Sequence, residues 1–206
     1  MASKLNVLMF LGTTREGRLG PRVAQFVQHQ LKTKYDLMLL DAEDLNLPML
    51  KKALHFYEDP SQAPKVLLDC KAKIQAADAF IVITAEYNTG MPPALSNMLN
   101  HFGPKSFSYK PSGIISYSVG IFGGVRAAMQ LRCFLGEIGT LSVSNVFAIP
   151  EIHNALDENG KPLNEHMVTG LDHMISQLDW YAHAMKNHRN MTGVPKYIPK
   201  SDIIYE

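Results

Sequence analysis

Residues 5–20 read LNVLMFLGTTREGRLG, and this stretch holds a strand, a loop and the approach to a helix. Residues 5–11 are almost uninterrupted apolar sequence, which is typical of a parallel strand covered by helices on both faces. Residues 12–20 are rich in glycine and polar side chains, and Pro21 then suits the first turn of a helix. Apolar residues recur at helical spacing after it, at Val23, Phe26, Val27 and Leu31. The stretch therefore predicts one strand–loop–helix unit of an α/β protein.

The same unit recurs along the chain. Further strands are predicted at residues 36–41, 79–84, 112–117 and 141–149, and further helices at residues 65–76, 93–101, 124–136 and 165–185. Because strand–helix–strand connections are right-handed, we expect a three-layer, doubly wound α/β fold with a five-stranded parallel sheet in the order 2-1-3-4-5. In that order strands one and three flank the switch point at which ligands bind.

The length of the chain predicts a single domain. It has 206 residues, of which 46% are hydrophobic, and this is enough for one well-buried core. We assign residues 1–189 to the domain. Residues 190–206 contain Pro195 and Pro199, show weak periodicity and are interpreted as a C-terminal extension in the form of an extended arm.

Charge and cysteine content exclude several classes of partner. Twenty basic and 19 acidic residues give a net charge of +1, so no broad field attracts nucleic acid or an anionic membrane. No stretch approaches the roughly 20 apolar residues of a membrane span. Cys70 and Cys133 are far apart and are interpreted as reduced thiols, which favours a cytoplasmic location. The eight histidines match no common metal-site spacing, so no metal is expected.

Three loops follow predicted strands and carry the polar chemistry: Gly12–Gly20, Thr84–Met91 and Ser116–Arg126. Carboxyl ends of parallel strands meet at one edge of a sheet, so the loops are expected to share one ligand. In the first loop, the hydroxyl of Thr13, the guanidinium groups of Arg15 and Arg18 and the N–H groups of the following helix suit a phosphate.

The first loop also partly matches other kinds of site. Gly12 and Gly17 have the glycine spacing of a P-loop, but Arg18 and Leu19 replace its lysine and its serine or threonine. A GxGxxG dinucleotide fingerprint is also missing from the loop. Taken alone, the loop is equally consistent with an ordinary glycine-containing turn whose arginines are solvated. The other two loops favour the ligand site.

The second loop continues into a helix as TAEYNTGMPPALSNMLNHF, residues 84–102, and the third region reads SYSVGIFGGVRAAMQLR, residues 116–132. Together with GTTREGR, residues 12–18, these segments resemble the three motifs of the NADPH-dependent FMN reductase family, a flavodoxin-like group that includes quinone and azo-dye reductases. The resemblance covers roughly residues 5–185. The chain departs from the family pattern at several positions. Thr13 replaces serine, Arg18 and Leu19 replace a smaller polar pair, Ala85 replaces proline and Ser96 replaces lysine.

The resemblance implies a set of FMN-binding residues. In this family the first loop binds the FMN phosphate, the second follows the isoalloxazine edge, and the third contacts the opposite part of the ring. The corresponding positions here are Thr13, Arg15 and Arg18, then Glu86, Tyr87 and Asn88, then Ser118, Gly120 and Gly123. Phe107, Tyr109 and Phe122 are candidates for the substrate face or equally for the core. Arg126 is a candidate for the 2′-phosphate of NADPH, and it could equally orient the N-terminus of its own helix or meet a carboxylate.

The resemblance also implies an activity. Hydride would pass from NADPH as co-substrate, through bound FMN, to a small-molecule acceptor such as a quinone, an azo dye or free flavin. No catalytic side chain is predicted, because the cofactor carries the chemistry. A homodimer or homotetramer is expected, with the partner chain completing the substrate side of the pocket.

Two other functions are consistent with the same motifs and the same predicted fold. A flavodoxin-type electron carrier would bind FMN and exchange single electrons with proteins, although the near-zero net charge does not provide the acidic face expected of one. A flavin-binding, redox-sensing interaction module would have the same fold and the same site.

Overall fold

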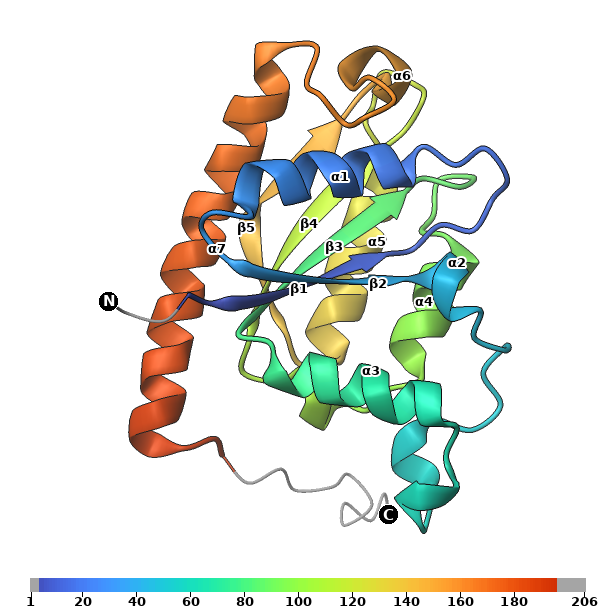
Figure 1. Ribbon diagram of the computed structural model, residues 1–206, viewed down its shortest axis with the longest axis vertical. Coiled ribbons are helices and arrows are strands. Elements are labelled where there is room, and N and C mark those ends of the chain that lie inside the picture. The colour runs from blue at the N-terminus through green and yellow to red at the C-terminus, as the bar shows by residue number, and fades with distance from the viewer. Residues whose placement is uncertain (1–3, 196–206) are drawn as a thin grey trace, which may run out of the picture.

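The computed structural model describes residues 4–195, and its core is one parallel sheet (Figure 1). The strand order is β2-β1-β3-β4-β5, and every neighbouring pair is parallel, as predicted. The strands are β1 (Asn6–Leu11), β2 (Asp36–Asp41), β3 (Ala79–Ala85), β4 (Pro111–Tyr117) and β5 (Leu141–Ile149). Their observed bounds lie within one residue of the predicted ones.

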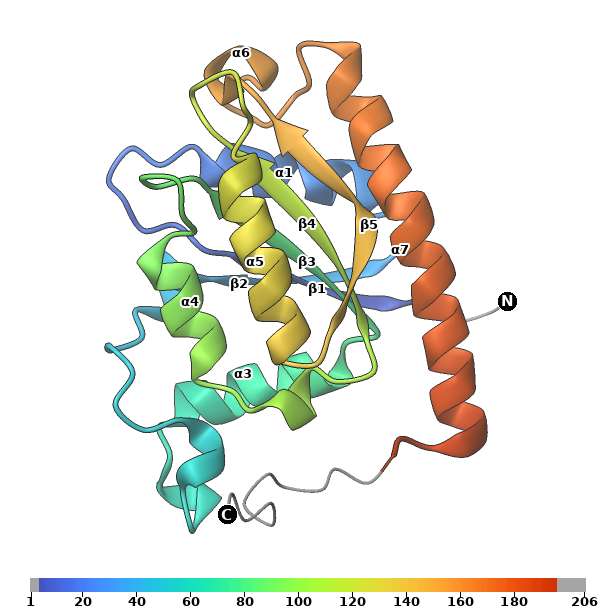
Figure 2. The same cartoon turned by 180° about the vertical axis from the view of Figure 1, so that it is seen from behind.

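Helices cover both faces of the sheet. Helices α1 and α7 pack on one face, and α3, α4 and α5 pack on the other, as the two opposite views show (Figures 1 and 2). The helices are α1 (Gly20–Leu31), α2 (Ala42–Leu45), α3 (Lys65–Ala76), α4 (Pro93–Asn100), α5 (Val125–Glu137), α6 (Ile152–Ala155) and α7 (Glu165–Thr192), with short 3-10 helices at η1 (Leu54–Phe56), η2 (Pro60–Gln62) and η3 (Pro104–Ser106). The three-layer prediction is confirmed.

Alternate residues of β1 explain why its sequence is apolar throughout. Val7, Met9 and Leu11 belong to the hydrophobic core beneath α1 and α7. Leu8 and Phe10 belong to the second core, beneath α3, α4 and α5. Because both faces of the strand are buried, neither set of alternating positions is polar.

The last helix is longer than its periodicity predicts. We expected it to end near Met185, but α7 continues to Thr192. Its last buried residue is Ala182, so the final turns have no apolar stripe that sequence inspection can detect. They are held by Lys186 and Arg189, which pair with Asp78 at the start of β3. The predicted arm therefore begins inside this helix, and residues 196–206 lie outside the described part of the chain.

The turns after β1, β3 and β4 lie at the same end of the sheet (Figure 1). Strands β1 and β3 are neighbours, but β1 leads to a helix on one face while β3 leads to a helix on the other. This divergence leaves room between the loops, which is where open parallel sheets bind ligands. Within residues 4–195, none of the helices is both long enough and apolar enough to cross a membrane.

Candidate functional site

A cavity of about 270 Å³ lies where the three loops meet. The first loop lines it from Arg15 to Leu19, the second contributes Ala85, Glu86 and Tyr87, and the third contributes Tyr117, Ser118 and Val119, with Ile152 of α6 beside them. Segments about 100 residues apart in sequence thus line one cavity. Behind the lining, the hydroxyl of Tyr117 donates to that of Thr13, 104 positions away in sequence. The predicted convergence of the three strand ends is observed.

Arg18 of the first loop is engaged by the protein itself. Its two terminal nitrogens donate to the two carboxylate oxygens of Asp41 at 2.5 and 2.8 Å, and one of them also donates to the carbonyl of Thr13 at 2.5 Å. Both side chains are largely buried, with 15% of Arg18 and 8% of Asp41 exposed. Hydrogen bonding to Asp41 raises the pKa of Arg18, so the guanidinium stays charged. This bidentate ion pair connects the first loop to the end of β2.

The N-terminus of α1 is open toward the cavity. No side chain within residues 4–195 caps it, and the residues leading into it, from Gly17 to Leu19, line the cavity. The first N–H groups of a helix lack internal partners and carry partial positive charge, so they attract anions. Close packing of Gly12 against Leu95 of α4, where a Cβ would overlap the leucine side chain, fixes the start of the loop.

Arg15 connects the first loop to the second. Its guanidinium carbon lies 3.5 Å from the centre of the Tyr87 ring, which is a cation–π contact. Arg15 is exposed and lines the cavity, and no carboxylate within residues 4–195 makes an ion pair with it. The stacked cation therefore remains available to an incoming anion.

Tyr87 begins a tight turn with an unusual backbone. Tyr87 and Gly90 exchange N–H to carbonyl hydrogen bonds of 2.8 and 3.0 Å, and the two residues between them, Asn88 and Thr89, both have positive φ, at 49° and 67°. This is the geometry of a type I′ turn. A β-branched residue such as Thr89 rarely adopts positive φ, and strain of this kind gathers at functional sites.

Glu86 joins the second loop to the third. One of its carboxylate oxygens accepts from the backbone N–H groups of Arg126 and Ala127, and the other accepts from the Arg126 guanidinium. Burial opposes the charge, but these hydrogen bonds outweigh it and hold the pKa of Glu86 below its ordinary value. The carboxylate therefore caps α5. Arg126 meets this carboxylate, which was one of the roles its sequence position allowed.

Two glycines shape the third loop. Gly123 and Gly124 both have positive φ, and a Cβ at Gly124 would lie 2.8 Å from the carbonyl oxygen of Tyr117. The hydroxyl of Ser116 donates to the carbonyl of Gly123 at 2.8 Å, and the hydroxyl of Ser118 donates to that of Gly120 at 3.0 Å. The loop folds back on the end of β4 and leaves a run of apolar side chains exposed, namely Val119, Ile121 and Phe122.

The structure divides the predicted site residues into two groups. Five of them line the cavity: Arg15, Arg18, Glu86, Tyr87 and Ser118. Four lie outside its lining: Thr13, Asn88, Gly120 and Gly123. Thr13 is fully buried behind the loop, where its hydroxyl meets that of Tyr117 at 3.4 Å, and burial raises the pKa of Tyr117 to about 12.

Two aromatic candidates for the substrate face lie elsewhere. Phe107 is buried and packs with Phe10, Phe80 and Phe102 in the core beneath α3 and α5. Tyr109 precedes β4, so it lies at the amino end of the sheet and contacts Arg189. Phe122 is exposed in the third loop. Of the two alternatives open for Phe107, the core is therefore the observed one. The substrate-face alternative is wrong for both Phe107 and Tyr109, because both come before the strand whose far end forms the cavity.

Sequence reasoning missed several residues of the site. Asp41 and Tyr117 are the last residues of predicted strands, so their placement at this edge was readable although no motif marks them. Ile152 belongs to a four-residue helix that has no signal in the sequence. Asp41 matters most of these, since it binds the arginine that the pattern assigned to a ligand.

The sequence of this chain is similar to those of several known proteins. The profile of a family described as NADPH-dependent FMN reductase matches residues 5–154. The chain is 27% identical over 179 residues to a subunit of the NADH:(hydroxy)cinnamate reductase of Vibrio ruber, a match that covers 84% of this chain and 85% of that protein. It is 25% identical over 183 residues to a quinone reductase of Escherichia coli, covering 86% and 94% of the two chains.

A solved structure supports the same fold. The flavoenzyme NAD(P)H:(acceptor) oxidoreductase FerB from Paracoccus denitrificans superposes with a TM-score of 0.68 and 22% sequence identity. The superposition covers 89% of this chain and 98% of that one. The three-layer arrangement is therefore shared over nearly the whole length of both proteins.

Proposed function

The chain belongs to the NADPH-dependent FMN reductase family and is an NAD(P)H-dependent flavin oxidoreductase, and on this premise we propose that it transfers hydride from NADPH through FMN to quinones, azo compounds or free flavin. The observation that carries the proposal is the cavity in which all three loops meet. When bound, FMN supplies the capacity to accept and donate hydride, so the chain needs to bind and orient it.

We place the phosphate of FMN at the first loop. The uncapped N-terminus of α1 and the guanidinium of Arg15 offer donors on the same side of the cavity. Arg18 lines this region too, but its terminal nitrogens already bond Asp41 and Thr13, so its main contribution is to keep the loop in shape. Thr13 supports the loop from beneath.

The ring of the cofactor belongs between the second and third loops. Tyr87 and Ser118 both line the cavity, and Glu86 connects their loops through Arg126 and the start of α5. Because Glu86 already occupies the N-terminus of α5, the ring is held by backbone groups of the loops rather than by that helix end. The contacts of Asn88, Gly120 and Gly123 with the ring remain predictions.

We further propose that a second copy of the chain covers the third loop and completes the acceptor side of the pocket, in a homodimer or homotetramer. Val119, Ile121 and Phe122 are each at least 60% exposed, and Val119 lines the cavity. Val125 and Met129 extend the apolar surface along α5. Patches of this kind mark interaction sites. Light scattering of the FMN-loaded protein tests this, and a clean monomer would contradict it.

A cytoplasmic location completes the proposal. Both cysteines are free thiols, one buried and one exposed, which suits a reducing compartment.

Stopped-flow absorbance of the FMN-loaded protein tests the activity. Mixing with NADPH under anaerobic conditions is expected to bleach the flavin band, and a second mixing with 1,4-benzoquinone is expected to restore it. A flavin that stays oxidised in NADPH contradicts the proposal. NADH in place of NADPH measures the nicotinamide preference in the same experiment.

A further inference from the structure

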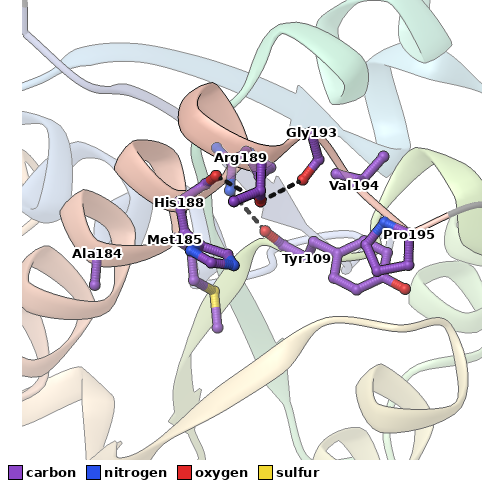
Figure 3. Close-up of a pocket in the computed structure, with 9 residues that line it drawn as sticks. Tyr109, Ala184, Met185, His188, Arg189, Gly193, Val194 and Pro195 are labelled. Atoms are coloured by element: carbon purple, nitrogen blue, oxygen red, sulfur yellow. Dashed lines mark hydrogen bonds between the residues drawn. The ribbon is translucent and has the colours of Figure 1, made fainter.

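Two adjoining cavities lie at the amino end of the sheet, away from the flavin site. They measure about 560 and 630 Å³ and share Tyr109, Arg189, Val194 and Pro195. The first is otherwise polar and basic, lined by Gln75, Lys105, Ser106, Ser108 and Lys110. The second is mostly apolar and runs along α7, where Figure 3 shows Ala184, Met185 and His188 on the helix and Tyr109 and Pro195 across from them. Volumes of this size suit small-molecule ligands.

Lys110 lies at the inner wall of the basic cavity. Its side chain is buried, and its ammonium group donates to the carbonyls of Ile74 and Gln75 at 2.8 Å each, which are at the end of α3. An ammonium has three N–H donors, and within the described part of the chain carbonyls accept from two of them. The nearest aromatic ring, that of Phe80, has its centre 5.6 Å from the ammonium, so the third donor can bond an oxyanion that enters the cavity. Arg189 lies on the other side, where it donates to the carbonyl of Tyr109 at 2.6 Å.

Positive charge exceeds negative charge around these cavities. Lys186 and Arg189 both pair with Asp78, at 2.8 and 3.5 Å, and Asp78 also accepts from the backbone N–H of Asn6. Neither cavity is lined by a carboxylate from residues 4–195. Burial, together with the charge of Arg189, lowers the pKa of Lys110 to about 8. Within residues 4–195, Asp78 is thus paired with two cations, and Lys110 makes no ion pair.

We propose that these cavities form a second ligand site, which binds an amphiphilic oxyanion: a carboxylate or phosphate head between Lys110 and Arg189, and an apolar body along α7 against Tyr109 and Met185. The anion supplies the charge that Asp78 alone does not provide, and charge-assisted hydrogen bonds to it are the strong kind. Arg189 holds Tyr109 in a conformation with φ of 63°, which is rare for an aromatic residue, and so fixes the ring between the two cavities. The site is independent of the flavin reaction.

Isothermal titration calorimetry on the full-length, FMN-loaded protein tests the proposal with three probes that share one apolar body. Octanoate and octyl phosphate carry the two oxyanions, and octanamide is neutral. At least one anion is expected to bind with 1:1 stoichiometry and at least about tenfold more tightly than octanamide. Comparison of the two anions identifies the preferred head. Absence of binding by both anions, or equal binding of octanamide, would overturn the proposal.

Substitutions on the exposed surface of α7 localise the binding without disturbing the core. Ala184→Glu puts a negative charge inside the apolar cavity and is expected to weaken anion binding at least about tenfold. Asn187→Glu adds the same charge to the same helix at an exposed position outside both linings, and it is expected to leave the affinity within about twofold of the parent. Equal losses in the two variants would mean a diffuse charge effect and no site at these cavities.

Discussion

The two ends of the sheet differ in how far their positive charges are neutralised. At the carboxyl end, Arg18 is matched by Asp41 and Arg126 by Glu86, and both pairs join one loop to another element. At the amino end, Lys186 and Arg189 share the carboxylate of Asp78, and Lys110 makes no ion pair within residues 4–195. The pairs at the carboxyl end therefore stabilise the conformation of the loops. Arg15 and the backbone N–H groups are left to bind a ligand. The amino end keeps a surplus of charge.

Substitution of Arg18 should have the largest effect among the changes that test this comparison. Arg18→Met leaves Asp41 largely buried without its partner, and the free energy of unfolding is expected to fall by about 3 kcal/mol. FMN affinity is expected to fall with it, because the first loop loses its tie to β2. Urea denaturation followed by circular dichroism measures the first effect, and fluorescence titration with FMN measures the second.

The matched control for this change is Lys65→Met. Lys65 pairs with Asp69 one turn along the exposed face of α3, and an exposed pair of this kind contributes about 0.5 kcal/mol or less. A similar loss in the two variants would show that the Arg18 pair is no more than a surface contact, and the proposed division between the two ends of the sheet would then be wrong.

Glu86→Gln tests the second tie at the carboxyl end. A neutral amide is a weaker acceptor for Arg126 and for the N–H groups of α5, so we expect a loss of about 2 kcal/mol near pH 7. The folded pKa of Glu86 is lowered, so its contribution is present above the ordinary glutamate pKa and disappears as the pH falls through the folded value. The stability difference between parent and variant should therefore shrink in acid.

Denaturation of both proteins at pH 7 and at several values below 4.5 measures this convergence. A difference that stays constant over the whole range would indicate that the substitution acts through packing rather than through the charge of Glu86.

The sequence predicts the frame of the molecule much better than the identity of the charged contacts. Residues 65–76 and 141–149 have the predicted bounds because their apolar patterns are set by burial, which is local information. The two carboxylates that neutralise Arg18 and Arg126 lie 23 and 40 residues away from them. Pairing across such distances depends on the register of neighbouring strands, which a motif does not contain.

A related limit concerns two aromatic residues whose position residue type alone left open. Phe107 and Tyr109 precede β4 by a few residues, so a correct strand assignment places them at the amino end of the sheet. The alternative in which they line the flavin site relied on residue type alone. The position of a residue relative to the direction of its strand is thus a better guide to the ligand than its aromatic character.

The pH dependence of stability sharpens the comparison at the amino end. The pKa of Lys110 is lowered to about 8 in the folded protein, whereas in the unfolded chain it has the ordinary lysine value of 10.5. The unfolded state therefore binds more protons between these values, and stability attributable to Lys110 should rise with pH there. Between pH 8 and 9.5, below the ordinary pKa of tyrosine, we expect a rise of about 1.5 kcal/mol in the parent and none from this source in Lys110→Met. Lys65→Met should keep the parental slope, and a Lys110→Met slope equal to that of the parent would contradict the assignment.

Arg15→Ala gives the smallest expected effect and separates the ligand-binding cation from the structural ones. Arg15 has no carboxylate partner within residues 4–195, so its loss should cost little stability. We expect FMN to bind about tenfold more weakly, since one charge-assisted bond to the phosphate is lost, while riboflavin binding stays within about twofold. Flavin fluorescence titrations with both ligands give this ratio.

Tyr87→Phe is the control, because it keeps the ring that Arg15 stacks on and should leave the ratio of FMN to riboflavin affinity unchanged. Equal losses for FMN and riboflavin in Arg15→Ala would mean that Arg15 orders the second loop through Tyr87, and the phosphate would then belong to the N–H groups of α1 alone.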